Sequence, residues 1–281
     1  MLRWIAVGLT TFTVAMAGTS MADVLAEIAE RGTIRLGIRG DAAPFSYLSQ
    51  ETEPSGLAVK LCEEVAGEIG REIGVPDLEI VHRVVTSSGR FNALNSGQTD
   101  LHCGPASATL KRRMTMDFSL LYYVDGAAVA ARPGGYAAMY DTRQADVGVL
   151  EGTTTVQIAE TLLTENNVTG ELQKFPSHRR GLKALAAGDI DIYVGDQAIL
   201  LFQIEELGLE NDILVNEEVL SFEPYALVMK RGESALRLAV DRALSRIYHD
   251  GRVFDLIQDN LGDYPISPEV RAVYEIVGLP E

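Results

Sequence analysis

Apolar and polar residues alternate in some segments of the chain and recur every four residues in others. Alternation over Thr33–Ile38 predicts a first strand that ends at Arg39, and Pro44 should keep the following stretch extended. Apolar residues spaced by four predict an amphipathic helix that ends near Gly70. Further strands are predicted over 78–85, 99–103, 147–150 and 190–194, with a short one ending at 174–178. Further helices are predicted around 91–94, 156–159, 182–187, 199–207, 236–247, 253–257 and 265–281.

Strands that alternate with helices argue for a largely parallel sheet covered on both faces. A small apolar run over 126–131 is the candidate crossing into a second domain, and 225–229 is the candidate return. Segment 181–191 repeats the pattern of 90–100, which is a short helix, a glycine turn and a buried strand. The chain is therefore expected to form two similar α/β lobes, with the final helix packed on the first.

The N-terminus has the features of a secretory signal peptide. Arg3 precedes a mostly apolar run from Trp4 to Ala17, and Ser20-Met21-Ala22 offers small residues at the cleavage site. A transmembrane anchor is the alternative, but the run is short and is interrupted by threonine. The mature protein is expected to begin near Asp23 and to be exported.

Composition narrows the functional classes. The 281 residues are 47% hydrophobic and 23% charged, which is typical of one large or two medium globular domains. A net charge of −16 argues against nucleic-acid binding, which needs clustered positive surface. The only cysteines are Cys62 and Cys103, too few for a cysteine-rich scaffold or a multi-cysteine zinc site. In an exported protein they are expected to pair, with two buried free thiols as the alternative.

The stretch from Gly104 to Arg113 is the clearest candidate for binding chemistry. If Thr109 caps a helix, Arg112 occupies its third position and can point back over the loop that contains Ser107. A guanidinium beside a hydroxyl and a loop carbonyl suits a carboxylate with a neighbouring ammonium group. The alternative is a capped surface helix with a solvated basic pair.

Other candidates follow predicted strand or turn ends, where α/β sheets bind ligands. Arg39 and Arg90 are two of them, although solvated or lobe-bridging arginines are common at such positions. Asp196 follows a buried strand and could instead cap the next helix. His178, read alone, is more typical of a surface histidine.

In the order and spacing of its motifs, the chain resembles the extracellular solute-binding proteins of family 3, the amino-acid receptors of bacterial ABC transporters. The resemblance covers nearly the whole mature chain. It looks closest to the glutamate/aspartate-binding branch, which also has a cysteine in the first helix and a Cys-Gly before the carboxylate loop. The motifs are Gly37 to Pro44-Phe45-Ser46-Tyr47, Gly56, Arg90 to Leu94, Ser96-Gly97, Gly104 to Arg112, Asp117-Phe118-Ser119, Gly152-Thr153-Thr154 and Ile190-Asp191 to Asp196.

This resemblance implies an α/β, two-lobed periplasmic binding protein fold of type II. Each lobe would be a mostly parallel sheet flanked by helices, and two hinge strands would join the lobes. The expected divisions are a signal peptide at 1–22, a first lobe at 23–126 and 223–281, and a second lobe at 127–222.

The resemblance also implies a role for each site residue. Arg112 and Ser107 would hold the α-carboxylate of an amino acid. Asp196 would bind the α-ammonium, with an acceptor at Pro105, where the branch often has serine and proline supplies only its carbonyl. Thr154 would contact the ligand from the second lobe, at a helix N-terminus suited to anions. The positions that match those holding a side-chain carboxylate are Arg39, Ser87, Arg90 and His178.

One departure from the family pattern bears on the ligand. Many members place an aromatic residue two positions before the Pro-Phe pair, where this chain has Ala42. The branch that has an arginine at the position of Arg39 lacks this aromatic as well. The resemblance therefore favours glutamate or aspartate over lysine, histidine or a large apolar amino acid.

The expected function is that of a monomeric periplasmic receptor that closes on glutamate or aspartate and delivers it to the membrane permease of an ABC importer. No cofactor, metal or nucleic acid is expected. The alternatives are a binding protein for another polar amino acid, a sensing module for a membrane kinase, and a periplasmic dehydratase on the same scaffold. An enzyme is not expected, because the sequence has no His-Glu-x-x-His motif and no nucleophile elbow.

Overall fold

The structure is a computed structural model, and it describes residues 23–49, 52–262 and 267–280. The predicted signal peptide, residues 1–22, lies outside the described residues. Among the helices that are described, none has both the length and the apolar character needed to cross a membrane.

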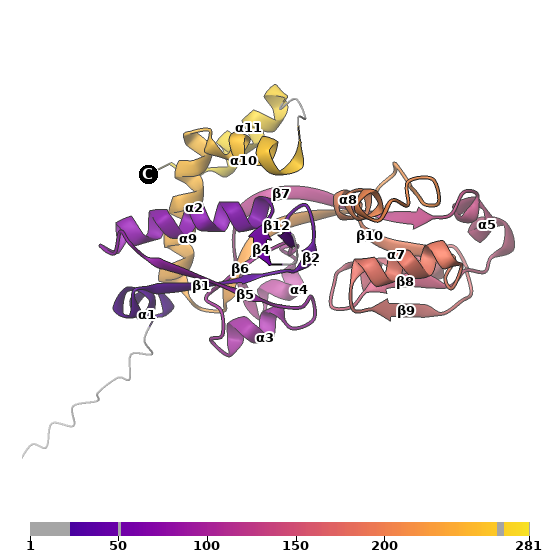
Figure 1. The fold of residues 1–281 in the computed structure, drawn as a ribbon, viewed down its shortest axis with the longest axis horizontal. Helices are drawn as coiled ribbons and strands as arrows, with labels where there is room; N and C mark the ends of the chain where they lie inside the picture. Colours follow the sequence, from indigo (N-terminus) through magenta and orange to yellow (C-terminus); the bar gives the residue numbers. More distant parts are fainter. Residues whose placement is uncertain (1–22, 50–51, 263–266, 281) are drawn as a thin grey trace, which may run out of the picture.

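Two lobes lie side by side, joined by two long strands that run through both (Figure 1). These are β7 (Met116–Ala131) and β12 (Ser221–Lys230), which pair antiparallel from Ser221 opposite Ala127 to Lys230 opposite Met116. The prediction of a two-lobed α/β fold is confirmed. The predicted lobe boundaries at 126/127 and 222/223 fall inside these strands and stay a prediction.

The first lobe holds the N-terminal and C-terminal elements. Its parallel strands β5, β1 and β6 lie beside β12, and a separate small sheet has the order β2-β3-β4. The strands are β1 (Thr33–Ile38), β2 (Asp41–Ala42), β3 (Ser46–Ser49), β4 (Glu53–Ser55), β5 (Glu79–Val84) and β6 (Leu101–Cys103). The helices are α1 (Val24–Arg31), α2 (Leu57–Glu72), α3 (Arg90–Asn95), α4 (Leu110–Arg113), α9 (Ser234–His249), α10 (Arg252–Leu261) and α11 (Pro268–Val277).

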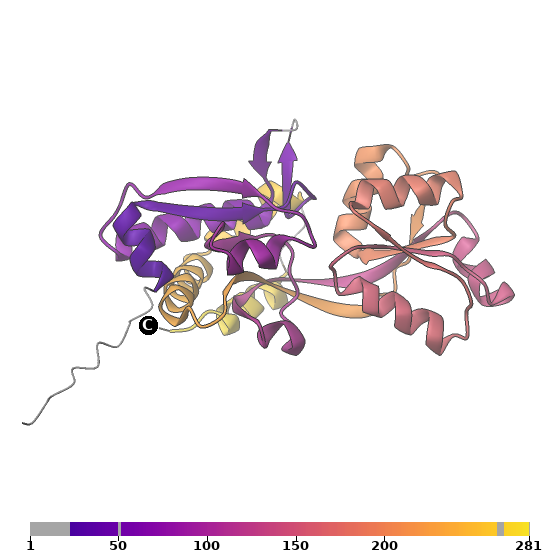
Figure 2. The ribbon, with the colours of Figure 1, turned by 90° about the horizontal axis from the view of Figure 1, so that it is seen from below.

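The second lobe continues the same sheet beyond β7, in the order β10-β8-β9, with β11 also pairing with β7. Its strands are β8 (Val147–Leu150), β9 (Leu172–Phe175), β10 (Ile192–Asp196) and β11 (Leu214–Val215). Helices cover both faces (Figure 2), and they are α5 (Gly135–Thr142), α6 (Thr155–Glu165), α7 (His178–Ala187) and α8 (Gln197–Leu207).

Strand periodicity explains the two apolar cores of the second lobe. In β10, Ile192 and Val194 face one core, and Tyr193 faces the other. Neighbouring positions of β7 divide in the same way, with Val129 and Ala131 on one side and Ala130 on the other. Because successive side chains of a strand point to opposite faces, a sheet covered by helices on both sides needs apolar residues at every position.

Two predictions about the first lobe are confirmed. Cys62 of α2 and Cys103 of β6 form a disulfide, with their Cα atoms 6.0 Å apart. The tail helix α11 packs on this lobe, where the Tyr274 hydroxyl donates to the Tyr122 carbonyl at 2.7 Å.

Several element predictions need correction. The stretch around Pro44 is extended only in part: β2 and β3 are strands, but the Phe45 N–H donates to the Ala42 carbonyl at 3.0 Å and closes a turn between them. The crossing strand begins at Met116 rather than at Gly126, since half-exposed residues between the lobes interrupt its apolar pattern. Helices α1 and α5 were not predicted, α7 begins four residues before Leu182, at His178, and β10 begins at Ile192.

Candidate functional site

The loop between β6 and α4 has the predicted geometry. Thr109 caps α4, its Oγ1 accepting the Arg112 N–H at 3.2 Å, and Arg112 Nη1 reaches back to the Ser107 carbonyl at 3.1 Å. The loop also pairs with β12, since the Ala108 N–H donates to the Pro224 carbonyl at 2.8 Å. Arg112 is partly buried, so the alternative of a solvated basic pair is wrong for this residue.

Arg39 and Arg90 are both buried, each with 2% of its surface exposed, so neither is a solvated arginine. At the end of β1, Arg39 Nε donates to Asp41 Oδ1 at 2.9 Å. At the start of α3, Arg90 Nη1 donates to the Ser87 carbonyl and Oγ, and Nη2 reaches the Gly152 carbonyl of the second lobe at 3.2 Å. Arg90 thus bridges the lobes, which was one of the alternatives considered for it.

The positive charges in this region reinforce one another. Burial, followed by the charges of Arg112 and Arg39, lowers the pKa of Arg90 well below its usual range. Arg90 Nε is also buried without a hydrogen-bond partner among the described residues. A buried cation next to two others has a strong electrostatic preference for an added anion.

His178 is buried, so the surface alternative is wrong. It begins α7, and its Nδ1 lies 3.2 Å from the Tyr193 hydroxyl. Burial lowers the pKa of His178 to about 4, with smaller and opposing effects from Asp41 and Arg39. At neutral pH the imidazole of the unliganded protein is therefore uncharged, and it offers a neutral hydrogen-bonding group to a ligand.

Asp196 stands at the end of β10, and its side chain does not cap α8. Instead, Asp196 Oδ2 accepts the Tyr225 hydroxyl at 2.5 Å, while Oδ1 is buried without a hydrogen-bond partner among the described residues. Burial raises the pKa of Asp196 to about 7, and the charges of Asp125 and Glu223 add to this rise. An adjacent ammonium group would supply the missing positive charge.

The two lobes touch at this site. The Ser87 hydroxyl donates to the Glu151 carbonyl at 2.8 Å, and Thr154 Oγ1 donates to Glu223 Oε2 at 2.8 Å. Pro105 is buried in the loop that carries Ser107. Predicted residues of the first lobe and of the second therefore meet where the two lobes touch.

Sequence reasoning missed four residues of this site, namely Asp41, Asp125, Glu223 and Tyr225. Tyr225 donates to Asp196 and lies 3.3 Å from Asp125 Oδ2, and Phe45 packs against its ring at 5.2 Å between centroids. A signal was available for two of them. Asp125 directly precedes the small apolar segment 126–131, and Glu223 stands two residues before the apolar segment 225–229, both of which are predicted to cross between domains.

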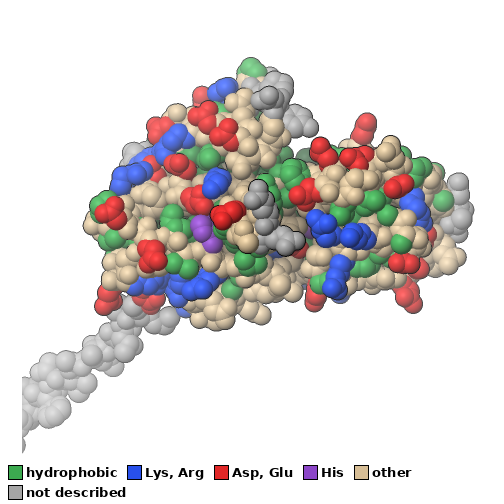
Figure 3. Space-filling view, viewed as in Figure 1, with side chains coloured by type: hydrophobic (Ala, Val, Ile, Leu, Met, Phe, Trp, Pro, Cys, Tyr) green, Lys and Arg blue, Asp and Glu red, His purple; other side chains and the backbone are tan. Residues whose placement is uncertain are grey.

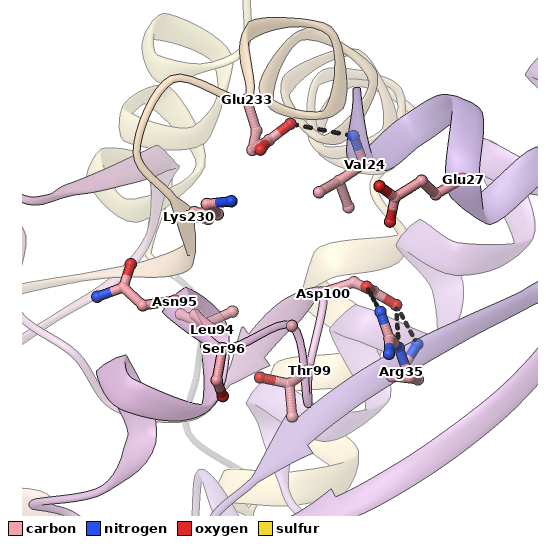
Figure 4. A pocket seen from close by; sticks show the side chains of 11 residues that line it. Val24, Glu27, Arg35, Leu94, Asn95, Ser96, Thr99, Asp100, Lys230 and Glu233 are labelled. Atoms are coloured by element: carbon pink, nitrogen blue, oxygen red, sulfur yellow. Dashed lines mark hydrogen bonds and ion pairs between the residues drawn. The ribbon is translucent and has the colours of Figure 1, made fainter. Parts of the chain in front are cut away.

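Two cavities lie outside the cluster of arginines. One, of about 510 Å³, runs along α6 and is lined in part by Thr154 and Glu223. The other, of about 300 Å³, lies on the first lobe among α1, α3 and the end of β12 (Figure 4). In its wall Arg35 pairs with Asp100, and Glu233 accepts the Val24 N–H. None of the predicted binding residues, all of which the structure describes, lines this second cavity.

Residues 34–263 match the family of bacterial extracellular solute-binding proteins, family 3. The chain belongs to this family. The prediction from its motifs is therefore confirmed at the level of the family.

Two relatives are similar in sequence along most of the chain. The L-glutamate/L-aspartate-binding protein of Pseudomonas aeruginosa is 26% identical over 247 residues, which cover 87% of this chain and 82% of that protein. The glutamate/aspartate import solute-binding protein of Escherichia coli is 21% identical over 270 residues, covering 92% and 89%. These relatives are binding proteins rather than enzymes by their names.

A solved structure of an ancestral arginine-binding protein bound to arginine is similar in fold. It has a TM-score of 0.74 and 24% sequence identity, and the match covers 83% of this chain and 99% of that one. At this identity the similarity supports the fold and not the ligand.

Proposed function

We propose that the protein binds an acidic α-amino acid, glutamate or aspartate, between its lobes and delivers it to the permease of an ABC importer. One observation carries this proposal. Three arginines whose charges act on one another lie where the lobes meet, and Asp196 nearby has a buried oxygen without a hydrogen-bond partner among the described residues. An acidic amino acid carries two carboxylates and one ammonium, which is the complementary set of charges.

Each predicted residue has a part in this proposal. Arg112 pairs with the α-carboxylate, beside Ser107 and Thr154, and Asp196 accepts from the α-ammonium near the Pro105 carbonyl. The side-chain carboxylate lies against the remaining group, which consists of Arg39, Ser87, Arg90 and the neutral His178. Charge-assisted hydrogen bonds contribute about 1.5–3 kcal/mol each, and micromolar affinity needs about 8 kcal/mol, so a few such bonds suffice.

Surface charge favours an anionic ligand locally, although the whole chain is acidic. Figure 3 shows basic side chains gathered on the second lobe, where α7 and β9 lie. The exposed basic residues of these elements are Lys174, Arg179, Arg180 and Lys183. Because α7 begins at the buried His178 in the cleft, their field acts near the entrance and offsets the repulsion from distant, screened acidic groups.

The relatives support the same assignment, since two of them are named for glutamate and aspartate. On this proposal the protein acts outside the cytoplasm after removal of residues 1–22, works as a monomer with a separate permease, and releases its ligand chemically unchanged. A binding protein for another polar amino acid, a sensing module and a dehydratase remain the alternatives.

Titration calorimetry with the twenty amino acids on purified mature protein tests the ligand. Glutamate or aspartate should bind at least about a hundredfold more tightly than glutamine or asparagine, because a neutral amide leaves Arg39 or Arg90 poorly paired. Binding of amides or cationic amino acids alone would overturn the acidic assignment. Recovery of the ligand after incubation, checked by NMR, tests whether it is left unchanged.

A further inference from the structure

Glu223 is a buried carboxylate in the middle of the proposed site, with 3% of its surface exposed. It lies in β12, where that strand passes between the lobes. Its Oε2 accepts the hydroxyl protons of Ser107 from the first lobe and, at 2.8 Å, of Thr154 from the second. Its Oε1 accepts the Ser221 hydroxyl at 2.9 Å. One internal carboxylate thus accepts a hydrogen bond from a hydroxyl of each lobe.

The number of protons restricts what these hydroxyls can do for a ligand. A serine or threonine hydroxyl has one proton to donate and two lone pairs that accept. While Ser107 and Thr154 donate to Glu223, neither can also donate to a ligand carboxylate. Toward the cleft they offer lone pairs, which suit an ammonium group.

The charges around Glu223 point in the same direction. Asp125 and Glu223 both act on Asp196 and, together with burial, raise its pKa to about 7. Arg112 feels the charges of Glu223 and Asp196, and these oppose the lowering of its pKa by burial. Asp196 Oδ1 is buried and has no hydrogen-bond partner among the described residues. This side of the cleft therefore has an excess of negative charge, which a cationic group would balance.

We infer that Glu223 is a positioning and specificity-determining residue that makes the site select ligands with an α-ammonium group. Its carboxylate turns the protons of Ser107 and Thr154 away from the cleft and adds a second negative charge beside Asp196. The α-carboxylate of the ligand is then left to Arg112. This inference rests on the proposed function and refines the roles of the two hydroxyls within it.

The test compares each amino acid with its counterpart that lacks only the amino group. Glutarate is the counterpart of L-glutamate, and succinate is that of L-aspartate. Affinities of the full mature protein are measured by calorimetry, with displacement for weak ligands. In Glu223→Gln the amide keeps the shape of the side chain and loses its charge. Where its NH2 group takes the place of Oε2, the Ser107 and Thr154 hydroxyls must accept from it, and their protons become free to turn toward the ligand. The affinity for the amino acid should fall at least about tenfold, while that for the diacid stays equal or rises.

Two further variants keep the result interpretable. Glu218→Gln removes the same charge from an exposed residue in the wall of the same cavity, and it should leave both affinities unchanged. Ser107→Ala removes the hydroxyl itself. It should weaken only the amino acid if Ser107 accepts from the ammonium, but weaken both ligands if Ser107 donates to the α-carboxylate. This variant also serves if Glu223→Gln does not fold.

Besides a loss of both ligands in Ser107→Ala, three results in Glu223→Gln would overturn the inference. An equal loss of both ligands in Glu223→Gln would indicate a purely structural role, and tighter binding of both would indicate that Glu223 competes with the ligand carboxylate. If both affinities stay at their wild-type values, Glu223 does not affect selection. The proposed function fails separately, if the wild-type protein binds no amino acid at all.

Discussion

At the scale of single residues, burial decides what the charged side chains of the cleft can do. Arg39 and Arg90 follow strand and turn ends, which in sequence fits solvated arginines equally well, yet both are buried. His178 is buried too, and its lowered pKa makes it neutral, so that it adds no positive charge to that of the arginines. These states arise from residues of both lobes, and so a local reading of the sequence could not assign them.

Arg112 and Arg90 should separate general from specific recognition. Arg112→Ala should lower the affinity for every amino acid at least about a hundredfold, because two charge-assisted hydrogen bonds to the shared α-carboxylate are lost. Arg90→Ala should mainly reduce the preference for glutamate over glutamine, by about tenfold or more. Calorimetry measures both, with Arg113→Ala as the control, since this neighbour on α4 is exposed. Binding retained in Arg112→Ala would contradict the proposed site.

Ligand binding should release protons near neutral pH. Burial raises the pKa of Asp196 to about 7 and that of Asp125 to about 6, and the charge of Glu223 adds to both rises. A hydrogen bond from Tyr225 opposes both rises, and the charge of Arg112 opposes that of Asp196. A ligand ammonium beside Asp196 favours its ionised form, so affinity should rise with pH between about 5 and 8. Calorimetry at pH 6.5 in buffers of different ionisation enthalpy counts the protons, and zero release would contradict this prediction.

Asp196 and Asp125 also affect the stability of the unliganded protein, which should fall as pH rises, whereas the affinity for the ligand should increase. Between about pH 4 and pH 7 the folded chain keeps protons on Asp196 and Asp125 that the unfolded chain has lost. These groups therefore lower the free energy of unfolding as pH rises through this range. Denaturant unfolding without ligand, compared between wild type and Asp196→Asn, would show whether that decline becomes smaller.

At the scale of elements, the turn between β8 and α6 sets how closely the lobes approach. Gly152 has a φ of +77°, and a Cβ atom there would lie 2.8 Å from the Ser88 Cα of the first lobe. The nearest atoms all belong to the backbone, so they cannot move aside as the tip of a side chain could. Glycine at this position therefore permits both the turn and the contact between the lobes.

Gly152→Ala should weaken ligand binding about tenfold or more, because its methyl group obstructs the closed arrangement. Gly208→Ala is a matched control, since Gly208 has a φ of +65° in the same lobe but nothing within 4 Å of an added Cβ. Both variants should lose similar stability, by about 1 kcal/mol, from the strained backbone. Equal affinities in the two variants would show that the contact with Ser88 is unimportant for binding.

At the scale of the whole molecule, a protein of net charge −16 has to admit an anion. Basic residues on α7 lie near the site, whereas many acidic residues lie farther away. Salt screens charges more strongly as their distance grows, so the attraction and the repulsion of an anionic ligand depend differently on ionic strength.

Arg179→Glu with Arg180→Glu should slow glutamate association several-fold at low salt and have little effect near 0.5 M salt, because screening removes the steering field. Stopped-flow fluorescence measures the rates. The control is Arg83→Glu with Arg237→Glu, which makes the same change in net charge at exposed positions of the first lobe. Similar slowing in both pairs would mean that only total charge matters.

Periodicity, caps and motif order were sufficient to predict most elements, the two lobes and the loop that carries Arg112, and the pairing of Cys62 with Cys103 followed from the expected export of the protein. These features depend on neighbours in sequence or on the family pattern. The protonation of Asp196 and His178, and the position of Glu223 between two hydroxyls, came only from the tertiary structure. Glu223 meets Ser107 across 116 positions of sequence and Thr154 across 69, and burial that removes water makes those contacts decisive.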